Sequence, residues 1–300
     1  MFVMKNILIS CIKSVFFILP EKTPNFLYTI VFKPNFIKSI VNKILIYIMP
    51  PEKNIPEGKI LLNREDPILS AAIMLDVYEK NETALIREKI TPRMKIIDIG
   101  ANIGYYTVIF SKLVGNDGKV ISFEPDIENY KFLQKNVEIN NLNNVEIVQS
   151  ALGKDNTEIE LFISTENKAD HRIYDSYDGR EKVKVKCYTL DSYLEDKLTK
   201  IDFIKIDVQG SEWMVLEGMK NTIKNNDKLC ILIEFWSYGI TKSGGDPFYF
   251  LTSLKNLGFR IFCLTSRHEI LEIVDIKIYV EKISRKLNYD KYYENLYCEK

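Results

Sequence analysis

One short stretch of the sequence combines an acid with glycines in a pattern that suits a charged ligand. Residues 98–104 read DIGANIG, with Asp98 two residues before Gly100 and Gly104 four residues further on. Glycines let a backbone approach a ligand closely, and the start of a following helix offers free amide donors. A dinucleotide site reads G-x-G-x-x-G, and a carboxylate here would repel a pyrophosphate. The motif favours a ligand with an ammonium and a sulfonium group, such as S-adenosylmethionine; the alternative is a glycine-rich turn with a capping acid.

Two later positions extend this predicted cofactor site. Glu124 ends the next predicted strand, where a carboxylate can accept hydrogen bonds from two ribose hydroxyls. The alternative for Glu124 is a helix-capping acid, since Asp126 follows. Ser150 ends the third predicted strand, where adenine would lie. The predicted cofactor-binding residues are Asp98, Gly100, Ala101, Asn102, Gly104, Tyr105, Glu124, Pro125, Ser150 and Ala151.

A second chemical group centres on Lys205 and Asp207. Lys205 interrupts an apolar run of the kind that forms a central parallel strand, and residues two apart on a strand share a face. A buried ammonium needs a partner, so one interpretation is a structural ion pair with Asp207 or Glu234. In the other interpretation these three side chains surround an acceptor hydroxyl. Asp207 would then orient or deprotonate the hydroxyl, and Lys205 would stabilise the developing alkoxide.

His171 is an alternative base, because histidine titrates near neutrality and this one lies in a polar segment. The predicted substrate-binding residues are Arg172, Glu212 and Trp236. Glu212 can instead cap the helix that begins near Ser211. We expect no metal, because no Asp-Asp or Asp-Asn pair accompanies the fourth predicted strand.

Strands that alternate with helices must position these residues. The predicted strands are 94–100, 119–125, 145–151, 202–208 and 228–236, followed by 259–265 and 270–280 as an antiparallel edge. This alternation predicts an α/β fold with a doubly wound, mostly parallel sheet. Such sheets bind ligands at the carboxyl ends of their strands, which is where the polar side chains occur.

The chain divides into four predicted regions. Residues 1–58 form a basic, apolar helical extension, and 59–88 form a lead-in helix that packs on the catalytic domain. Residues 89–280 form that domain, with an insertion at 153–200 whose stretches 159–164 and 182–190 alternate like a hairpin. Residues 281–300 form a polar, tyrosine-rich tail with no clear pattern.

The composition excludes several classes of protein. The 300 residues include 41 basic and 41 acidic side chains and 46% hydrophobic residues, unlike a disordered chain. Zero net charge gives no general reason to expect a nucleic-acid partner. The five cysteines are odd in number and form no C-x-x-C pair, which fits a reducing, cytoplasmic compartment.

The first fifty residues differ from the rest, with six lysines and one acid. Lys5 and Lys13 interrupt the apolar residues 2–19, so we expect neither a membrane span nor a signal peptide. Residues 35–49 place Ile37, Ile40, Val41, Ile44, Leu45 and Met49 at helical spacing, and Pro50 ends that helix. This arm either packs on the main domain or lies on an anionic membrane surface, which would be the inner face.

Several separate motifs together resemble the FkbM-type methyltransferases. They are DIGANIGYYT (98–107), FEPD (123–126), DHRI (170–173), DFIKIDVQGSE (202–212), VLEGM (215–219) and EFW (234–236), with a lead-in at 66–83. The resemblance covers about residues 66–265. It implies the class I (Rossmann-like) S-adenosylmethionine fold and methyl transfer to a hydroxyl of a sugar, a glycan, a glycolipid or a natural product. Lys80 stands where the family more often has Pro, so no ligand role carries over to Tyr78 and Glu79.

Two other functions compete with O-methylation. A methyltransferase that acts on nucleic-acid bases usually shows an N/D-P-P-Y-like turn after the fourth strand, where this sequence reads IDVQG. The remaining 250 residues are also acidic, which suits a phosphate backbone poorly. The other alternative is a membrane-associated binding protein that keeps the cofactor fold without chemistry. The expected partner is a small-molecule or glycan acceptor, and the sequence predicts no oligomeric state.

Overall fold

The structure, a computed structural model, describes residues 9, 13, 35–165, 167–195, 200–265 and 269–300. Apart from Ile9 and Lys13, the apolar stretch 2–19 lies outside the described residues. The same holds for most of the predicted extension up to residue 34.

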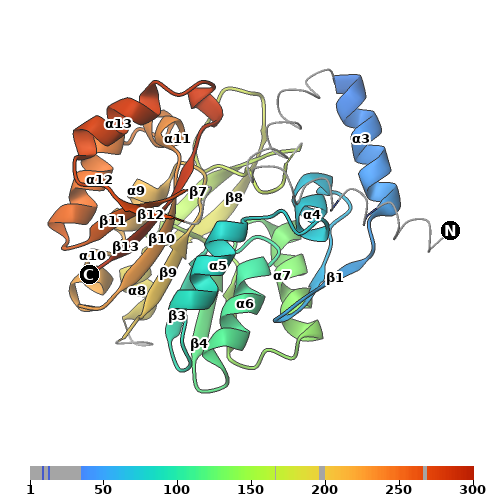
Figure 1. Ribbon diagram of the computed structural model, residues 1–300, viewed down its shortest axis with the longest axis horizontal. Helices are drawn as coiled ribbons and strands as arrows, with labels where there is room; N and C mark the ends of the chain where they lie inside the picture. Colours follow the sequence, from blue (N-terminus) through green and yellow to red (C-terminus); the bar gives the residue numbers. More distant parts are fainter. Residues whose placement is uncertain (1–8, 10–12, 14–34, 166, 196–199, 266–268) are drawn as a thin grey trace.

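An eight-stranded sheet forms the centre of the fold (Figure 1). Its spatial order is β12-β11-β13-β10-β9-β3-β4-β5. The strands are β3 (Lys95–Ile99), β4 (Lys119–Phe123), β5 (Val145–Val148), β9 (Phe203–Ile206), β10 (Cys230–Phe235), β11 (Arg260–Leu264), β12 (Ile270–Glu272) and β13 (Glu294–Glu299). The strands β3, β4, β5, β9 and β10 pair in parallel, whereas β13 is antiparallel to both of its neighbours. The predicted doubly wound, mostly parallel sheet with an antiparallel β11–β12 hairpin at its edge is confirmed.

The C-terminal part of the sheet differs from the sequence prediction. The predicted strand 270–280 is wrong beyond Glu272, because Ile276–Ser284 form helix α13, capped by the Asp275 carboxylate. The sequence shows no clear pattern over 281–300, and in the structure this segment contains β13, which inserts between β10 and β11. Leu296 and Cys298 are buried against one helical layer and Tyr297 against the other. Because β13 is buried on both faces, its sequence does not alternate apolar and polar residues. Charged residues at both ends also make its short apolar run hard to recognise as a strand.

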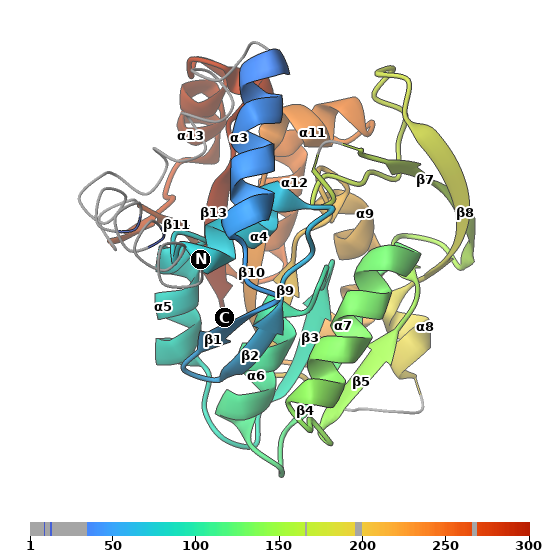
Figure 2. The ribbon, with the colours of Figure 1, turned by 90° about the vertical axis from the view of Figure 1, so that its right-hand side faces the viewer.

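Helices cover both faces of the sheet (Figures 1 and 2). One layer contains α5 (Lys80–Lys89), α6 (Tyr105–Val114) and α7 (Ile127–Ile139). The other layer contains α8 (Leu190–Leu194), α9 (Glu212–Glu217), α10 (Lys220–Lys224), α11 (Ser237–Lys242), α12 (Pro247–Asn256) and α13. A 3-10 turn, η2 (Tyr289–Lys291), precedes β13. Asp126 and Asp246 cap α7 and α12, because their side chains accept backbone hydrogen bonds at the starts of these helices.

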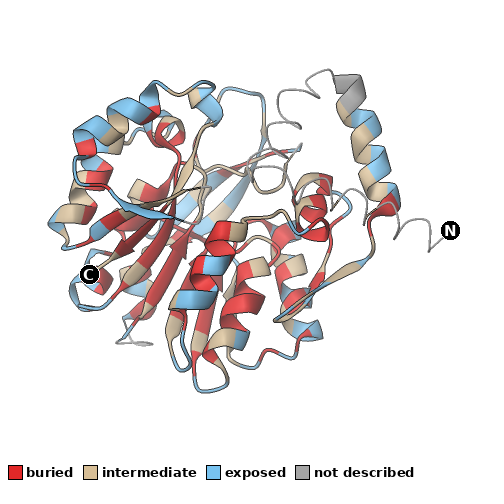
Figure 3. Cartoon of the chain, viewed as in Figure 1, coloured by how far each residue is buried: buried red, intermediate tan, exposed pale blue. Residues whose placement is uncertain are grey.

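Alternation along the strands sends side chains to two separate cores. Ile97 and Ile99 pack with the α8–α13 layer, while Ile96 and Phe203 pack with α5 and α6. The strands are buried on both sides, as Figure 3 shows in red. Because side chains two apart share a face, Asp98, Lys205 and Glu234 point with Ile96, Phe203 and Leu232 toward α5 and α6. The sheet thus gathers three ionisable side chains from three neighbouring strands.

Two small sheets flank the main one. In the insertion, β7 (Thr157–Ile163) and β8 (Glu181–Tyr188) form the predicted antiparallel hairpin, and β6 (Ala151–Leu152) joins β8. The third predicted strand therefore ends at Val148. The predicted lead-in helix is two helices, α4 (Pro67–Met74) and α5, after the hairpin β1 (Glu52–Ile55) and β2 (Gly58–Leu61).

Helix α3 (Asn35–Ile48) confirms the predicted helix before Pro50. Its apolar residues divide between two sides: Leu45, Ile48 and Met49 pack inward, whereas Ile40, Ile44 and Tyr47 are 53%, 48% and 56% exposed. Upstream, Ile9 packs against the same inner cluster and Lys13 pairs with Asp76 at 2.5 Å. Among the described residues, no helix is long and apolar enough to cross a membrane.

Candidate functional site

A pocket of about 850 Å³, including the solvent at its mouth, lies at the carboxyl ends of β3, β4 and β9, where the strand order reverses. The predicted site residues that line it are Gly100, Ala101, Asn102, Tyr105, Glu124, Pro125, Ser150, Ala151, His171, Lys205 and Asp207. The predicted residues outside its lining are Asp98, Gly104, Arg172, Glu212, Glu234 and Trp236.

The glycine-rich turn lies in close contact with the end of β9. Gly100 has a φ of +78°, and a Cβ there would stand 1.9 Å from the carbonyl oxygen of Asp207. Asn102 also has a positive φ, of +51°. Asp98 is fully buried beneath this turn, and its Oδ2 accepts a 2.7 Å hydrogen bond from Thr107. Asp98 therefore supports the turn from below rather than lining the pocket.

Glu124 is tied to the same turn. Its Oε2 accepts the N–H of Asn102 at 2.8 Å, and its Oε1 accepts the N–H of Asp126 at 2.9 Å. Burial raises the pKa of Glu124 to about 8. Asp126, not Glu124, caps helix α7. The carboxylate of Glu124 is thus held at the pocket wall with lone pairs left for a ligand.

Several buried polar atoms around the pocket lack a hydrogen-bond partner within the described part of the chain. They include Ser150 Oγ and Asn129 Oδ1. Unsatisfied buried polar atoms are costly, so they mark positions that a bound molecule can complete. The set fits the predicted cofactor, whose adenosine offers hydroxyl and amino donors and whose methionine part carries an ammonium group.

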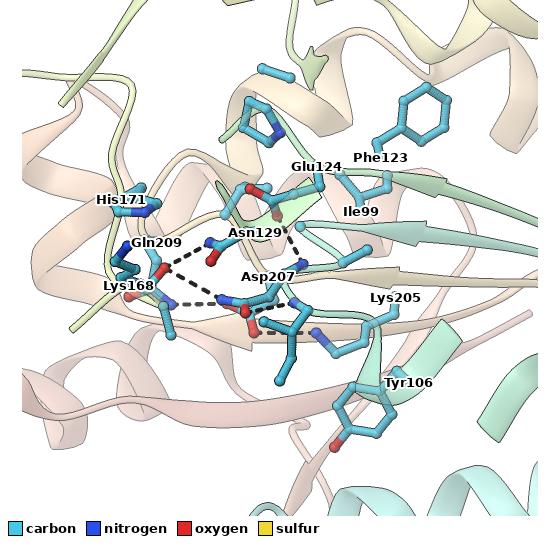
Figure 4. A pocket seen from close by; sticks show the side chains of 18 of the residues that line it. Ile99, Tyr106, Phe123, Glu124, Asn129, Lys168, His171, Lys205, Asp207 and Gln209 are labelled. Atoms are coloured by element: carbon cyan, nitrogen blue, oxygen red, sulfur yellow. Dashed lines mark hydrogen bonds and ion pairs between the residues drawn. The ribbon is translucent and has the colours of Figure 1, made fainter. Parts of the chain in front are cut away.

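His171 lies at the end of the pocket where Asp126 and Lys168 are found (Figure 4). Its Nδ1 accepts the backbone N–H of Ser164 at 3.0 Å, so the neutral ring carries its proton on Nε2. That Nε2 lies 3.9 Å from Asp126 Oδ1. Burial lowers the pKa of His171. The histidine is therefore a neutral donor at this end of the pocket.

Lys205 and Asp207 occupy the other part of the pocket, beside Tyr106 (Figure 4). Lys205 Nζ lies 3.2 Å from Asp207 Oδ2 and 4.9 Å from the centre of the Tyr106 ring. The Gln209 amide donates to Asp207 Oδ1 at 2.9 Å and to Glu234 Oε1 at 2.8 Å. Burial, with the charge of Asp207 as the second cause, raises the pKa of Glu234 well above its usual value. The predicted ion pair between Lys205 and Asp207 is thus present.

Tyr78 and Glu79 are site residues that sequence reasoning set aside. Tyr78 lines the pocket, and partly buried Glu79 accepts a 2.5 Å hydrogen bond from the Tyr106 hydroxyl. Burial raises the pKa of Glu79 to about 8. Glu79 also has a left-handed backbone, with a φ of +38°, which is strained for a residue with a side chain. The signal that could have identified these residues is the adjacent Tyr78 and Glu79 in the lead-in.

The three predicted substrate-binding residues have structural partners. Arg172 pairs with both oxygens of Asp170, at 2.8 and 2.9 Å, and stacks 4.7 Å from the Trp236 ring. Trp236 is 7% exposed, and its Nε1 donates to the carbonyl of Asp290. Glu212 accepts backbone N–H groups of the turn after β9, which supports the alternative in which it shapes that turn.

The described residues contain no group of three or more His, Cys, Asp or Glu side chains arranged to hold a metal ion. The candidate site therefore offers three features to a ligand. They are the backbone donors of the turn that begins at Gly100, the carboxyl group of Glu124 beside it, and Lys205 surrounded by acids.

Comparisons with known proteins agree with this arrangement. A family model described as the methyltransferase FkbM domain matches residues 98–261, more than half of the chain. "Methyltransferase 1" of Beauveria bassiana (strain ARSEF 2860) is 25% identical over 186 residues, which cover 55% of this chain and 72% of that protein.

Solved structures of methyltransferases are also similar to the chain. The FkbM methyltransferase of Methylobacillus flagellatus KT is 14% identical with a TM-score of 0.41, covering 89% of this chain and 60% of that one. An O-methyltransferase of Bacillus cereus solved with S-adenosylhomocysteine is 14% identical with a TM-score of 0.43, covering 92% and 96%. Because the family model spans most of the catalytic sheet, the chain belongs to the FkbM family of S-adenosylmethionine-dependent methyltransferases.

Proposed function

We propose that this methyltransferase acts on a hydroxyl group of a sugar, a glycan, a glycolipid or a natural product. One observation carries the proposal: Asp207, a carboxylate with a lysine on one oxygen and an amide on the other, lines the pocket beside the predicted methionine end. A hydroxyl must lose its proton as it is methylated, and a fixed carboxylate within reach supplies the acceptor for that proton.

The residues that would hold the cofactor line the rest of the pocket. We assign Glu124 to the ribose hydroxyls, Ser150 and Ala151 to adenine, and the turn from Gly100 to Gly104 to the methionine part. Four carboxyl groups lie around Lys205, and each of them that is ionised favours a cationic ligand. When bound, the cofactor supplies an electrophilic methyl group on a sulfonium.

Proton transfer then follows from the geometry of Asp207. Asp207 would take the O–H proton of the acceptor as that oxygen is methylated, and the bound cofactor would supply the methyl group and keep the electron pair of its broken bond. Lys205 stabilises the alkoxide that develops on the acceptor oxygen. The side chain of Asp207 is 19% exposed, so the proton can leave to solvent after the reaction. The domain mainly contributes by holding the reacting groups in line away from water.

His171 is the weaker candidate for the base. Its Nδ1 lone pair is used by the Ser164 N–H, and its Nε2 carries the proton of the neutral ring. Replacing Asp207 with Asn should therefore lower kcat by about 10²–10⁴-fold while S-adenosylhomocysteine affinity changes less. His171→Ala should keep more transfer than Asp207→Asn; the reverse order would overturn the assignment.

Labelled methyl transfer identifies the class of acceptor. Protein and S-adenosylmethionine with a radioactive methyl group are incubated with separated cell fractions: soluble glycans, extracted glycolipids and RNA. We expect label in a glycan or glycolipid fraction, and its loss with Asp207→Asn. Label in RNA would replace the proposal with nucleic-acid methylation, which the acids around the site disfavour. Cofactor binding with no transfer to any fraction would favour a binding protein.

We also propose that α3 places the enzyme at the cytoplasmic face of a membrane. Ile40, Ile44 and Tyr47 form an exposed stripe along the helix, and residues 1–50 carry six lysines and one acid. An apolar stripe in a basic segment suits an anionic bilayer surface. A lipid-linked glycan is then the favoured acceptor.

Vesicle flotation tests this proposal with point variants of the full chain. Wild-type protein should float with vesicles that contain anionic lipid, and Ile40→Ser/Ile44→Ser should not. The control is Val274→Ser/Ile278→Ser, which removes residues 77% and 65% exposed near α13, across the molecule from α3 (Figure 1). Equal flotation of both double variants, or none of the wild type, would overturn membrane attachment.

A further inference from the structure

The turn that follows β9 has an unusual backbone. Gln209 has a φ of +53° and Gly210 a φ of +96°, both in the left-handed region. A residue with a side chain is strained there, and such strain persists when the surroundings determine the conformation. Gln209 therefore lies in a conformation that its neighbours impose.

Glu212 imposes this conformation from below. Its side chain is fully buried, and Oε1 accepts the N–H of Val208 at 3.2 Å and that of Gly210 at 3.1 Å. One carboxylate oxygen thus binds the backbone on either side of Gln209. The Glu212 side chain consequently holds the backbone on both sides of Gln209 in a tight turn.

Helix α11 fixes the turn from the other side. A Cβ at Gly210 would stand 2.6 Å from the carbonyl carbon of Gly239. The hydroxyl of Ser243, just after α11, donates to the carbonyl of Gly210 at 2.7 Å. With backbone contacts on both sides, the turn has little freedom to relax.

The enforced turn directs the Gln209 amide between two carboxyl groups. Its Nε2 donates to Asp207 Oδ1 at 2.9 Å and to Glu234 Oε1 at 2.8 Å. An amide nitrogen has two hydrogens, so both are used. Lys205 occupies the other oxygen of Asp207 at 3.2 Å. Asp207 is therefore held by a donor on each oxygen, whereas Glu234 accepts from Gln209 alone in the hydrogen bonds found here.

We propose that Gln209 is a positioning residue for methyl transfer, whose amide fixes the orientation of the Asp207 carboxylate and links it to Glu234. This inference rests on the proposed role of Asp207 as proton acceptor. Burial and the neighbouring charge of Asp207 keep Glu234 protonated to a higher pH than an ordinary glutamate. Gln209 joins the two carboxyl groups without adding charge of its own.

The charged and titratable groups around Asp207 come from every element packed near it. They are Lys205, Glu234, Asp98, Glu79, Glu212, Tyr78 and Tyr293. Lys205 and Gln209 each donate to one oxygen of Asp207. Removing the Gln209 amide should therefore leave Asp207 Oδ1 without its donor and let the carboxylate change its orientation.

The experiment compares Gln209→Met with wild type by carbon-13 NMR of side-chain carboxyl groups, with S-adenosylhomocysteine bound. Asp207→Asn assigns the Asp207 signal. The matched control is Gln134→Met on exposed α7, which also removes an amide–carboxylate hydrogen bond, Gln134 Nε2 to Glu138 Oε1 at 3.0 Å. At pH 7 we expect the Asp207 carboxyl signal to move in Gln209→Met, because Oδ1 loses its donor, and to stay in place in the control. S-adenosylhomocysteine affinity should stay within about threefold.

Gln209→Asn provides a second variant that tolerates the left-handed backbone but has a shorter reach. It should show the same change of the Asp207 signal if Gln209→Met fails to fold. An unmoved Asp207 signal in a folded variant overturns the positioning role, even if Asp207→Asn abolishes transfer. A moved signal together with full activity of Asp207→Asn overturns the assigned base instead. In the transfer assay, Gln209→Met should lose kcat, with KM for the cofactor unchanged.

Discussion

Lys205 Nζ lies 3.2 Å from Asp207 Oδ2 in a setting where the lysine side chain is 6% exposed. Directly across the parallel register, Asp98 on β3 faces Lys205 on β9. The acids that surround Lys205 raise its pKa, although burial acts in the opposite direction. Lys205 thus balances several carboxyl groups that are removed from water.

Lys205→Met should therefore destabilise the fold strongly. Removing one partner of a buried pair leaves an uncompensated buried charge and costs about 3–5 kcal/mol. Urea denaturation at pH 7 measures the free energy of unfolding. The control Lys182→Met removes an exposed pair with Glu160, at 3.0 Å, and should change stability little. Equal losses for both variants would contradict the central role of Lys205.

Glu79 should make the stability of the free enzyme depend on pH. Its pKa is raised by burial from 4.5 to about 8, so the folded state holds this proton more tightly than the unfolded state does. The resulting stabilisation is fully present below about pH 4.5 and is lost as pH rises toward about 8. Glu79→Gln mimics the protonated acid and still accepts the Tyr106 hydrogen bond. In urea denaturation at pH 5.5 and pH 8, the free energy of unfolding of the variant relative to that of wild type should be greater at pH 8. A constant difference between the two proteins would contradict the raised pKa.

The order of elements from residue 94 to residue 264 could be predicted because continuous apolar runs alternate with helical patterns. Asp126 and Asp246 marked helix starts by a local mechanism, and both caps are present. The strand β13 could not be predicted in the same way. Its position between β10 and β11 depends on pairing with residues far away in sequence, which local periodicity does not report.

The same difference applies to the site. Gly100 and Glu124 can be recognised from the residues next to them in the sequence, and both line the pocket. Glu79 and Gln209 acquire their surroundings through tertiary contacts with Tyr106 and Glu234. Arg172 is predicted from the sequence to bind substrate, and in the structure Asp170, two residues earlier, binds its guanidinium.

Gly100→Ala should destabilise the protein more than a left-handed backbone alone would. Gly100 has a φ of +78°, and the added Cβ would stand 1.9 Å from the Asp207 carbonyl. Gly179 has nearly the same φ, +77°, but open space around it, which makes Gly179→Ala a matched control. We expect about 1 kcal/mol of destabilisation for the control and at least about 2 kcal/mol more for Gly100→Ala. Thermal melts and urea denaturation both report this difference. Similar values for the two variants would mean that the turn can move away from β9.

Cofactor binding should release a proton from Glu124. Its pKa is about 8 in the free protein, so at pH 7 the carboxyl group is mostly protonated. Ribose hydroxyls donate hydrogen bonds to the ionised form and therefore lower the pKa on binding. Titration calorimetry with S-adenosylhomocysteine in two buffers of different ionisation enthalpy measures the release, which should approach one proton at pH 7.

Glu124→Gln separates this effect from other groups. The variant should release no proton and bind S-adenosylhomocysteine about 10–100-fold more weakly, because a charge-assisted hydrogen bond contributes about 1.5–3 kcal/mol. Glu128→Gln is the control, since Glu128 is exposed on the first turn of α7 and pairs with Lys131 at 2.8 Å. It should bind like wild type and release the same proton. If Glu124→Gln still released the proton, the titrating group would be another buried acid of the site, and the ribose assignment of Glu124 would lose its support.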